Sequence, residues 1–357
     1  MARPAAMRPA IQIIDRVAKE RNEVALVGSG FLSPIYTLSS MSQGRQKEER
    51  PSSWRTCFEL DRDRVIHSNS YRRLRDKAQV HILPKEQNLT TRLIHTEEVY
   101  QIADSICNFL GLNRTLAEAI ARGHDLGHTP FGHVGESALT DIMQFYLKDK
   151  DYLFDHAVYG LHVIDSLERD GRGLNATAEV RDGILNHSTG VSDLRDAKNR
   201  PFTPEGMVVL YSDKIAYTAG DLEDAMRVGI LDKGSLPKAA MDVLGLGKPE
   251  WIRTMIEAVV ESSVESQRVD FHGPRFDAFT DVRKFMYKKV YGGDYAKVQQ
   301  AKSKRAVRLV FDHIMETRFQ DLEQRSAAFK TLDEVACMTD VSLVAYLKEN
   351  IIPSHVY

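Results

Sequence analysis

Cysteine is scarce in this sequence. The 357 residues include three cysteines, Cys57, Cys107 and Cys337, which lie far apart and never form a CxxC pair. This usage is typical of a protein that works in a reducing compartment, because disulfide frameworks belong to oxidising ones. It also gives no zinc-finger signal. We therefore expect a cytoplasmic protein.

Long apolar runs and a large net charge are absent as well. No apolar run approaches the roughly 18 residues of a membrane span, so we expect no contact with a membrane. The first residues, MARPAAMRPAIQIIDR, place Arg and Pro inside any apolar region, which disfavours a signal peptide. A net charge of −2 and a pI of about 6.6 disfavour a protein that coats nucleic acid, but leave room for a local basic pocket.

One stretch is strongly basic. Residues 61–83 combine apolar residues at helical intervals with many cations. Such a run is more often a solvated face than a binding surface. The alternative is a wall that faces phosphate, since the guanidinium fork suits phosphate oxygens, and weak binding of single-stranded nucleic acid stays open on this basis. The cations are Arg62, Arg64, Arg72, Arg73, Arg75 and Lys77.

The rest of the chain has helical periodicity and only weak strand signals, so the predicted fold class is all-α. We expect an N-terminal arm over residues 1–50, a core over 51–230 and further helices over 231–357 that pack on the core. A short helix is expected at 11–25 and a loop or mobile arm at 33–53. The other predicted helices are 91–110, 114–124, 136–147, 154–167, 177–186, 205–228, 248–263, 280–290, 301–319 and 341–348.

The densest group of polar side chains lies in residues 120–136, IARGHDLGHTPFGHVGE. His124 follows Leu116 and Ile120 at helical spacing, so its imidazole is predicted to face the core. A buried polar group without a partner costs about 1–3 kcal/mol, and the adjacent Asp125 is also costly to bury alone. A core histidine bonded to an aspartate is the simpler interpretation. However, a divalent metal ion would satisfy both side chains and better explains so dense a cluster.

Two other helices place a metal-competent residue on their inward stripe. His95 shares its stripe with Val99, Ile102 and Ile106, and Asp213 shares one with Val209 and Gly220. Together with His124 and Asp125 they form a mixed nitrogen and oxygen set, which suits Mn, Fe, Zn or Mg rather than thiolate chemistry. Four protein ligands would leave positions for water and substrate.

This H…HD…D pattern resembles the HD superfamily of metal-dependent phosphohydrolases, and specifically its deoxynucleoside triphosphate triphosphohydrolase (dGTPase-like) branch. The resemblance runs from about residue 52 to residue 340. It is carried by DRDRVIHSNSYRRLRDKAQV, TRLIHTEEV, GHDLGHTPFGHVGE, FDHAVYGLHVI, LNHS, YSDKIAYTAGDLEDA, RKFMYKKVYGG and DEVACMTD. It implies an HD helical bundle with additional C-terminal helices, and a divalent cation (Mn, Mg, Fe or Co).

The resemblance also implies roles for residues around the metal. The ligands would be His95, His124, Asp125 and Asp213. The reaction side would carry His128, His133, Glu136 and His156. Arg92 and Lys214 would clamp phosphates, Tyr217 and Asp221 would lie near the deoxyribose, and Gln79 would contact the 3′-hydroxyl. His81, His162 and His187 are interpreted as structural histidines.

The implied reaction is hydrolysis of dGTP or of dNTPs more broadly. Water would attack the α-phosphate, and His133, oriented by Glu136, would protonate the 5′-oxygen, releasing deoxynucleoside and inorganic triphosphate. Relatives often form homo-oligomers, and some respond to a nucleotide at a second site. Val341 and Ser342 stand where the branch has Arg-Tyr, so the resemblance assigns no C-terminal contact to a base or a neighbouring subunit.

Two other functions stay open at this point. An HD phosphodiesterase or nucleotidase acting on other nucleotides would share the ligands but not the extended motifs. A non-catalytic sensor of nucleotides or single strands would have the basic stretch as its best support. The full set of acid–base residues around the metal disfavours the sensor, because a purely structural ion does not need them.

Overall fold

The computed structural model describes residues 15–80, 88–188, 200–245, 247–291 and 294–353. These residues are helical, and their only β-type pairings are two isolated bridges, Arg45 to Thr177 and Ala78 to Thr91. The predicted all-α class is therefore confirmed. No described helix is long and apolar enough to cross a membrane. His81, for which a structural role is expected, lies outside the described residues.

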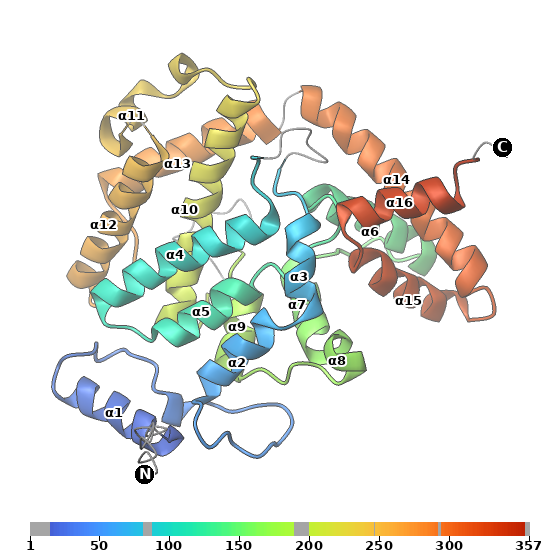
Figure 1. The fold of residues 1–357 in the computed structure, drawn as a ribbon. Coiled ribbons are helices and arrows are strands. Elements are labelled where there is room, and N and C mark those ends of the chain that lie inside the picture. Colours follow the sequence, from blue (N-terminus) through green and yellow to red (C-terminus); the bar gives the residue numbers. More distant parts are fainter. Residues whose placement is uncertain (1–14, 81–87, 189–199, 246, 292–293, 354–357) are drawn as a thin grey trace, which may run out of the picture.

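The central helices are α4 (Arg92–Leu110), α5 (Arg114–Gly123) and α10 (Pro204–Arg227), which pack on one another. Around them lie α2 (Cys57–Ile66), α9 (Ala178–Leu185) and the layer of α11 (Lys238–Leu244), α12 (Lys248–Ser266) and α13 (Pro274–Met286) (Figure 1). Their apolar side chains form one continuous core, with Ile102, Ile120 and Val209 fully buried.

A second apolar core lies beside the first. It is built by α6 (His133–Leu147), α7 (His156–His162), α14 (Asp294–Arg318), α15 (Gln324–Ala336) and α16 (Asp340–Asn350). Helix α15 was not among the predicted helices, and α13 begins earlier than the predicted segment 280–290. The polar site described below lies where these two cores meet, because α4 and α10 belong to the first, and α6 and α7 to the second.

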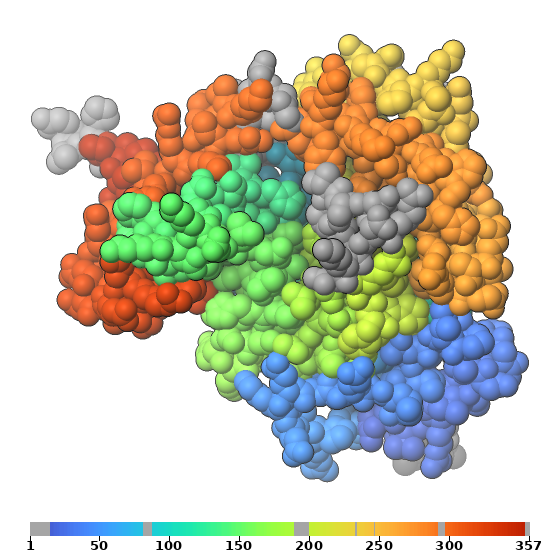
Figure 2. Space-filling model, turned by 180° about the vertical axis from the view of Figure 1, so that it is seen from behind, coloured from blue at the N-terminus to red at the C-terminus, as the bar shows by residue number. Residues whose placement is uncertain are grey.

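Short elements complete the described chain. They are α1 (Arg16–Gly28), α3 (Asn69–Arg73), α8 (Glu168–Gly171), the 3-10 turns η1 (Ser39–Met41), η2 (Leu74–Asp76) and η4 (Lys233–Ser235), and the π turns η3 (Val163–Leu167) and η5 (Tyr287–Tyr291). Seen from behind, the blue N-terminal segment lies at the bottom of the molecule and the red C-terminal helices lie at its left, next to the green segment (Figure 2).

The described part of the predicted arm contacts the core through polar bonds. Thr37 N–H and hydroxyl donate to the buried Glu205 carboxylate, and Arg45 pairs with the buried Asp61. The division of the chain at residues 50 and 230 stays a prediction.

The basic stretch is mostly engaged within the protein. Arg62 pairs with Asp63, Arg64 with Glu49, and Arg73 lies 3.8 Å from Glu168. Lys77 is buried and donates to the backbone carbonyls of His128 and Ala336. These contacts favour structural roles for these four cations over a phosphate-facing wall.

Candidate metal centre and active site

The four predicted ligands come from three helices and meet at one point. His95 lies in the first turns of α4, His124 caps the end of α5, Asp125 follows it, and Asp213 lies in the middle of α10. His95 Nε2 is 3.0 Å from Asp213 Oδ1, and His124 Nε2 is 3.2 Å from Asp125 Oδ1 and 3.8 Å from Asp213 Oδ1. Ligand bonds of about 2.0–2.2 Å to a shared ion allow such separations.

The tautomer of His124 shows that a cation fits this cluster. Its Nδ1 lies 2.6 Å from the backbone carbonyl of Ala121, which can only accept, so Nδ1 carries the hydrogen. Burial lowers the pKa of His124, so the ring is neutral and Nε2 presents a lone pair. Among the described residues this buried atom has no hydrogen-bond partner, and it faces carboxylate oxygens. A divalent metal ion would accept electron pairs from His124 Nε2 and from these carboxylate oxygens.

The two predicted phosphate clamps are ion-paired with predicted ligands. Arg92 Nη1 donates to Asp125 Oδ2 at 2.9 Å, and Lys214 Nζ donates to Asp213 Oδ2 at 2.8 Å, with all four side chains buried. Burial alone would raise the pKa of both aspartates. Neighbouring histidines and Arg92 hold the pKa of Asp125 well below its usual value, and Lys214 with the adjacent histidines does the same for Asp213. Both carboxylates are therefore ionised.

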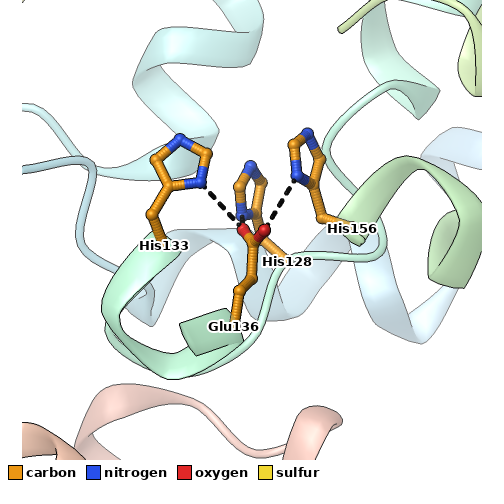
Figure 3. A group of neighbouring side chains, drawn as sticks. All are labelled: His128, His133, Glu136 and His156. Atoms are coloured by element: carbon orange, nitrogen blue, oxygen red, sulfur yellow. Dashed lines mark hydrogen bonds and ion pairs between the residues drawn. The ribbon is translucent and has the colours of Figure 1, made fainter. Parts of the chain in front are cut away.

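Glu136, in the first turn of α6, is the centre of a second cluster (Figure 3). Its Oε1 lies 2.8 Å from His128 Nδ1 and 3.0 Å from His133 Nδ1, and its Oε2 lies 3.3 Å from His156 Nδ1. The rings of His128 and His156 stack at 3.9 Å. His128 and His156 are buried, whereas the side chain of His133 is 74% exposed. His133 is therefore the histidine of this cluster that can reach a bound molecule from solvent.

The members of this second cluster differ in the direction in which their pKa values shift. Burial alone would raise the pKa of Glu136, but His156 and His128 hold it well below its usual value. Burial and the nearby Arg92 lower the pKa of His128 to about 4. Burial also opposes protonation of His156, but the Glu136 carboxylate outweighs it and raises the pKa of His156. The cluster thus holds a neutral His128 beside a His156 that favours protonation.

Local backbone geometry brings the two clusters together. Phe131 and Gly132 have φ values of 64° and 57°, so the chain turns sharply before α6 begins. Asp340, the first residue of α16, accepts from the backbone N–H groups of Phe131 and Ala78. The C-terminal helices therefore hold the loop that carries His128.

The residues predicted near the sugar have partners that sequence reasoning did not find. Tyr217 OH lies 2.8 Å from Arg283 Nε, which donates to it, and the buried Asp221 accepts from Tyr291 OH. Burial raises the pKa of Asp221 from 3.8 to about 7. Arg283 and Tyr291 both belong to the segment RKFMYKKVYGG, to which the sequence assigns a family resemblance but no role at the site.

The backbone of Gln79 lies next to Gly132, in the loop that precedes α6. Its backbone carbonyl would be 3.7 Å from a Cβ added at Gly132, and its side-chain Oε1 is buried without a partner among the described residues. This oxygen is therefore available to accept a hydrogen bond from a ligand.

His187 lies beside both clusters, which its sequence did not predict. It was interpreted as structural, but its Nε2 lies 3.2 Å from His156 Nε2, and its ring centroid lies 4.9 Å from that of His124. The only sequence signal is its place at the end of α9 in LNHS. His162 differs, because it bonds to Asp333 on α15, away from both clusters.

Comparisons with known proteins are consistent with this geometry. The HD domain family model matches residues 92–218, which include all four predicted ligands. A "Deoxyguanosinetriphosphate triphosphohydrolase-like protein" of Caldanaerobacter subterraneus subsp. tengcongensis is 41% identical over 91% of this chain and 93% of its own length. Proteins with the same name from Desulfatibacillum aliphaticivorans (41% identical, 80% of this chain, 81% of that protein) and Clostridium perfringens strain 13 (38%, 87% and 91%) are similar to it as well.

Proposed function

The chain belongs to the deoxyguanosinetriphosphate triphosphohydrolase-like family of HD-domain proteins, and from this premise we propose that it hydrolyses deoxynucleoside triphosphates to deoxynucleoside and inorganic triphosphate. The observation that carries the proposal is the adjacency of two clusters. A set of histidine and aspartate side chains suited to a divalent cation lies next to three histidines that share the Glu136 carboxylate. The first suits phosphate binding, and the second suits proton transfer.

His95, His124, Asp125 and Asp213 would hold the cation. When bound there, a divalent ion supplies Lewis-acid polarisation of a phosphoryl oxygen and increases the acidity of water. Its identity among Mn, Mg, Fe and Co stays open.

Arg92 and Lys214 are proposed to bind the triphosphate. Each has an N–H donor on a ligand carboxylate and further donors that it can offer to phosphate oxygens. In particular, Arg92 Nε is buried without a partner among the described residues. Charge-assisted hydrogen bonds of this kind are about twice as strong as neutral ones, which suits a substrate with about four negative charges.

His133 is the proposed general acid. Glu136 accepts from its Nδ1, so the exposed Nε2 can deliver a proton to the departing 5′-oxygen. His128 and His156 are fixed by the same carboxylate and are proposed to steady the phosphates. Because one carboxylate orients all three rings, a change at Glu136 should affect the proton donor and the phosphate contacts together.

The sugar is proposed to lie between Tyr217, Asp221 and Gln79. Tyr217 is held by Arg283, so its ring has a defined place from which to exclude a 2′-hydroxyl sterically. Asp221 and the unpartnered Gln79 Oε1 would form hydrogen bonds with the deoxyribose. This arrangement supports deoxynucleotides over ribonucleotides and leaves the preferred base open.

Product analysis tests the proposal. Purified protein is incubated with each dNTP or with GTP, in Mg²⁺, Mn²⁺ or Co²⁺, alone and in mixtures, and products are separated by HPLC. Inorganic triphosphate with deoxynucleoside supports the proposal, and ¹⁸O from water should appear in triphosphate. Orthophosphate as the product would favour the phosphodiesterase or nucleotidase alternative. Oligonucleotide binding with no turnover of any dNTP would favour the sensor.

We also propose, from the family alone, a cytoplasmic homo-oligomer whose turnover responds to a second nucleotide. Light scattering during size-exclusion chromatography, with and without dNTP, measures the oligomer. Dependence of dGTP turnover on a second dNTP in the mixtures measures the activation.

A further inference from the structure

One carboxylate reaches the site from the C-terminal part of the chain. Asp340 is the first residue of α16 and is only 2% exposed. Its Oδ1 accepts from the backbone N–H of Phe131 at 2.9 Å, in the histidine loop (residues 128–132). Its Oδ2 accepts from the backbone N–H of Ala78 at 3.1 Å, in the glutamine segment (residues 77–79). One side chain therefore bonds two segments that are distant in sequence.

The histidine loop sets where α6 begins. Phe131 and Gly132 both have positive φ values, a conformation that residues other than glycine rarely adopt. Gly132 is the N-cap of α6 and has no side chain with which to cap it, so the start of the helix depends on how this turn is held. His133 follows directly, and Glu136 lies in the first turn of α6. The bond from Phe131 to Asp340 therefore bears on the direction of the proposed proton donor.

The glutamine segment carries the proposed sugar contact. Gln79 follows Ala78 directly, and its Oε1 is buried without a partner among the described residues. A Cβ added at Gly132 would lie 3.7 Å from the Gln79 carbonyl and 3.8 Å from the Ala78 carbonyl, so the two segments are adjacent. Ala78 also forms an isolated bridge with Thr91, at the start of α4. The bond to Asp340 thus limits how far Gln79 can move relative to the loop.

We propose that Asp340 is a positioning residue: by bonding both segments, it sets the distance between the side chain that contacts the sugar and the histidine that protonates the leaving oxygen. Lys77 supports the same arrangement, since its ammonium donates to the carbonyls of His128 and Ala336. A substrate held at Gln79 presents its 5′-oxygen to the proton donor only if the two segments keep their relation. This catalytic consequence rests on the proposed dNTP hydrolysis, whereas the alignment of the segments does not.

Asp340→Ala tests this role, because it removes both acceptor oxygens at once. Glu168→Ala is the matched control. Glu168 is also buried and accepts from two backbone N–H groups, one on each carboxylate oxygen, but these belong to Asn69 and Ser70 on α3. If Asp340→Ala fails to fold by circular dichroism, Asp340→Asn replaces it. Asparagine keeps one acceptor oxygen and should therefore release only one of the two segments.

Amide hydrogen exchange measures the alignment without any substrate. It is followed by mass spectrometry with electron-transfer fragmentation, which resolves single amides. In Asp340→Ala, the amides of Ala78 and Phe131 should exchange about 10-fold faster or more, because each loses a hydrogen bond to a charged group. Glu168→Ala should leave both of these amides unchanged.

Turnover measures the catalytic consequence. The assay compares kcat/KM for the dNTP that the protein hydrolyses best with kcat/KM for its 2′,3′-dideoxy counterpart, which lacks the 3′-hydroxyl. Gln79→Ala should lower this ratio about 10-fold, as expected for one lost hydrogen bond. Asp340→Ala should lower it to a similar extent and reduce kcat as well, whereas Glu168→Ala should keep the wild-type ratio. The double variant Gln79→Ala/Asp340→Ala should lose little more than either single variant, because both changes break the same contact.

Two results would overturn the proposal. Unchanged exchange of the Ala78 and Phe131 amides in Asp340→Ala would mean that Asp340 does not hold the two segments. Faster exchange with an unchanged substrate ratio would mean that it holds them without positioning the substrate. Faster exchange in a protein that hydrolyses no dNTP would support the alignment and refute the proposed function, so the two failures are distinguished.

Discussion

Gly127 offers the sharpest test of how the fold positions the histidines proposed to take part in catalysis. It lies in the loop between α5 and α6 and packs against the first turn of α7, which begins at His156. A Cβ added at Gly127 would lie 2.0 Å from the backbone oxygen of His156 and 2.3 Å from the backbone nitrogen of Gly160. Because these are backbone atoms, no side chain can move aside, so Gly127→Ala must separate the loop from α7.

The size of the separation follows from the contacts. Real Cβ atoms essentially never approach closer than 3.0 Å, so the 2.0 Å contact requires a movement of at least 1 Å. A 1 Å movement of α7 away from its partners would lengthen the His156 contacts to Glu136 and His187, now 3.3 Å and 3.2 Å, beyond hydrogen-bond range. Overpacking of this kind costs about 1–3 kcal/mol, and a catalytic group misplaced by 1 Å can cost about 10²-fold in rate.

Gly160→Ala is the matched control. Gly160 lies across the same contact, but its added Cβ would lie 3.5 Å from the Ile184 side chain and 3.6 Å from the backbone nitrogen of Gly127, which are ordinary contacts. Its stability should change by less than about 1 kcal/mol, since alanine is the better helix former.

Urea unfolding and dNTP turnover should therefore distinguish the two variants. Gly127→Ala is expected to lose about 1–3 kcal/mol of unfolding free energy and about 10²-fold of kcat. If Gly127→Ala is as stable and as active as Gly160→Ala, the reasoning about this contact is wrong.

Three further predictions concern single side chains. Glu136→Gln replaces an acceptor oxygen with an NH₂ donor, so it cannot accept from both His133 and His156 and loses its charge beside His128; kcat should fall about 10²–10⁴-fold with little change in KM, measured by triphosphate release. Asp221→Asn removes a carboxyl whose pKa rises from 3.8 unfolded to about 7 folded. The wild type should therefore lose stability relative to this variant as pH rises from 4 to 7, by up to about 4 kcal/mol, measured by urea unfolding at each pH. Lys77→Met leaves the carbonyls of His128 and Ala336 without their buried donor, which should lower the unfolding free energy by roughly 2–4 kcal/mol.

Each of these predictions has an outcome that contradicts it. Turnover of Glu136→Gln equal to that of the surface control Glu334→Gln would remove Glu136 from the mechanism. For Asp221, a difference in unfolding free energy between wild type and Asp221→Asn that stays constant from pH 4 to 8 would mean that burial does not raise the pKa of this carboxyl. Lys77→Met should be compared with Lys330→Met, since Lys330 is exposed on α15. Equal unfolding free energies of the two variants would show that the Lys77 ammonium does not stabilise the protein through the carbonyls of His128 and Ala336.

The sequence by itself determined the helical class and the candidate ligands, because both depend on periodicity along single helices. His95, His124 and Asp213 lie on stripes that also carry Val99, Ile120 and Val209, and these stripes are buried. The polar members of such stripes are therefore buried, where each needs a partner. The order of motifs along the chain was likewise enough to predict the family before any coordinates were considered.

Only the tertiary structure decided which partners these residues have. His187, Arg283, Tyr291 and Asp340 contact the site from segments that are distant in sequence, and no spacing rule relates them to their partners. Packing of helices within the first core sets the contacts of Arg283 and Tyr291, and packing of the two cores against each other sets those of His187 and Asp340. Both depend on the shapes of the surfaces that meet. A periodic pattern shows which face of a helix is buried, but the neighbour that covers this face is settled when the helices pack.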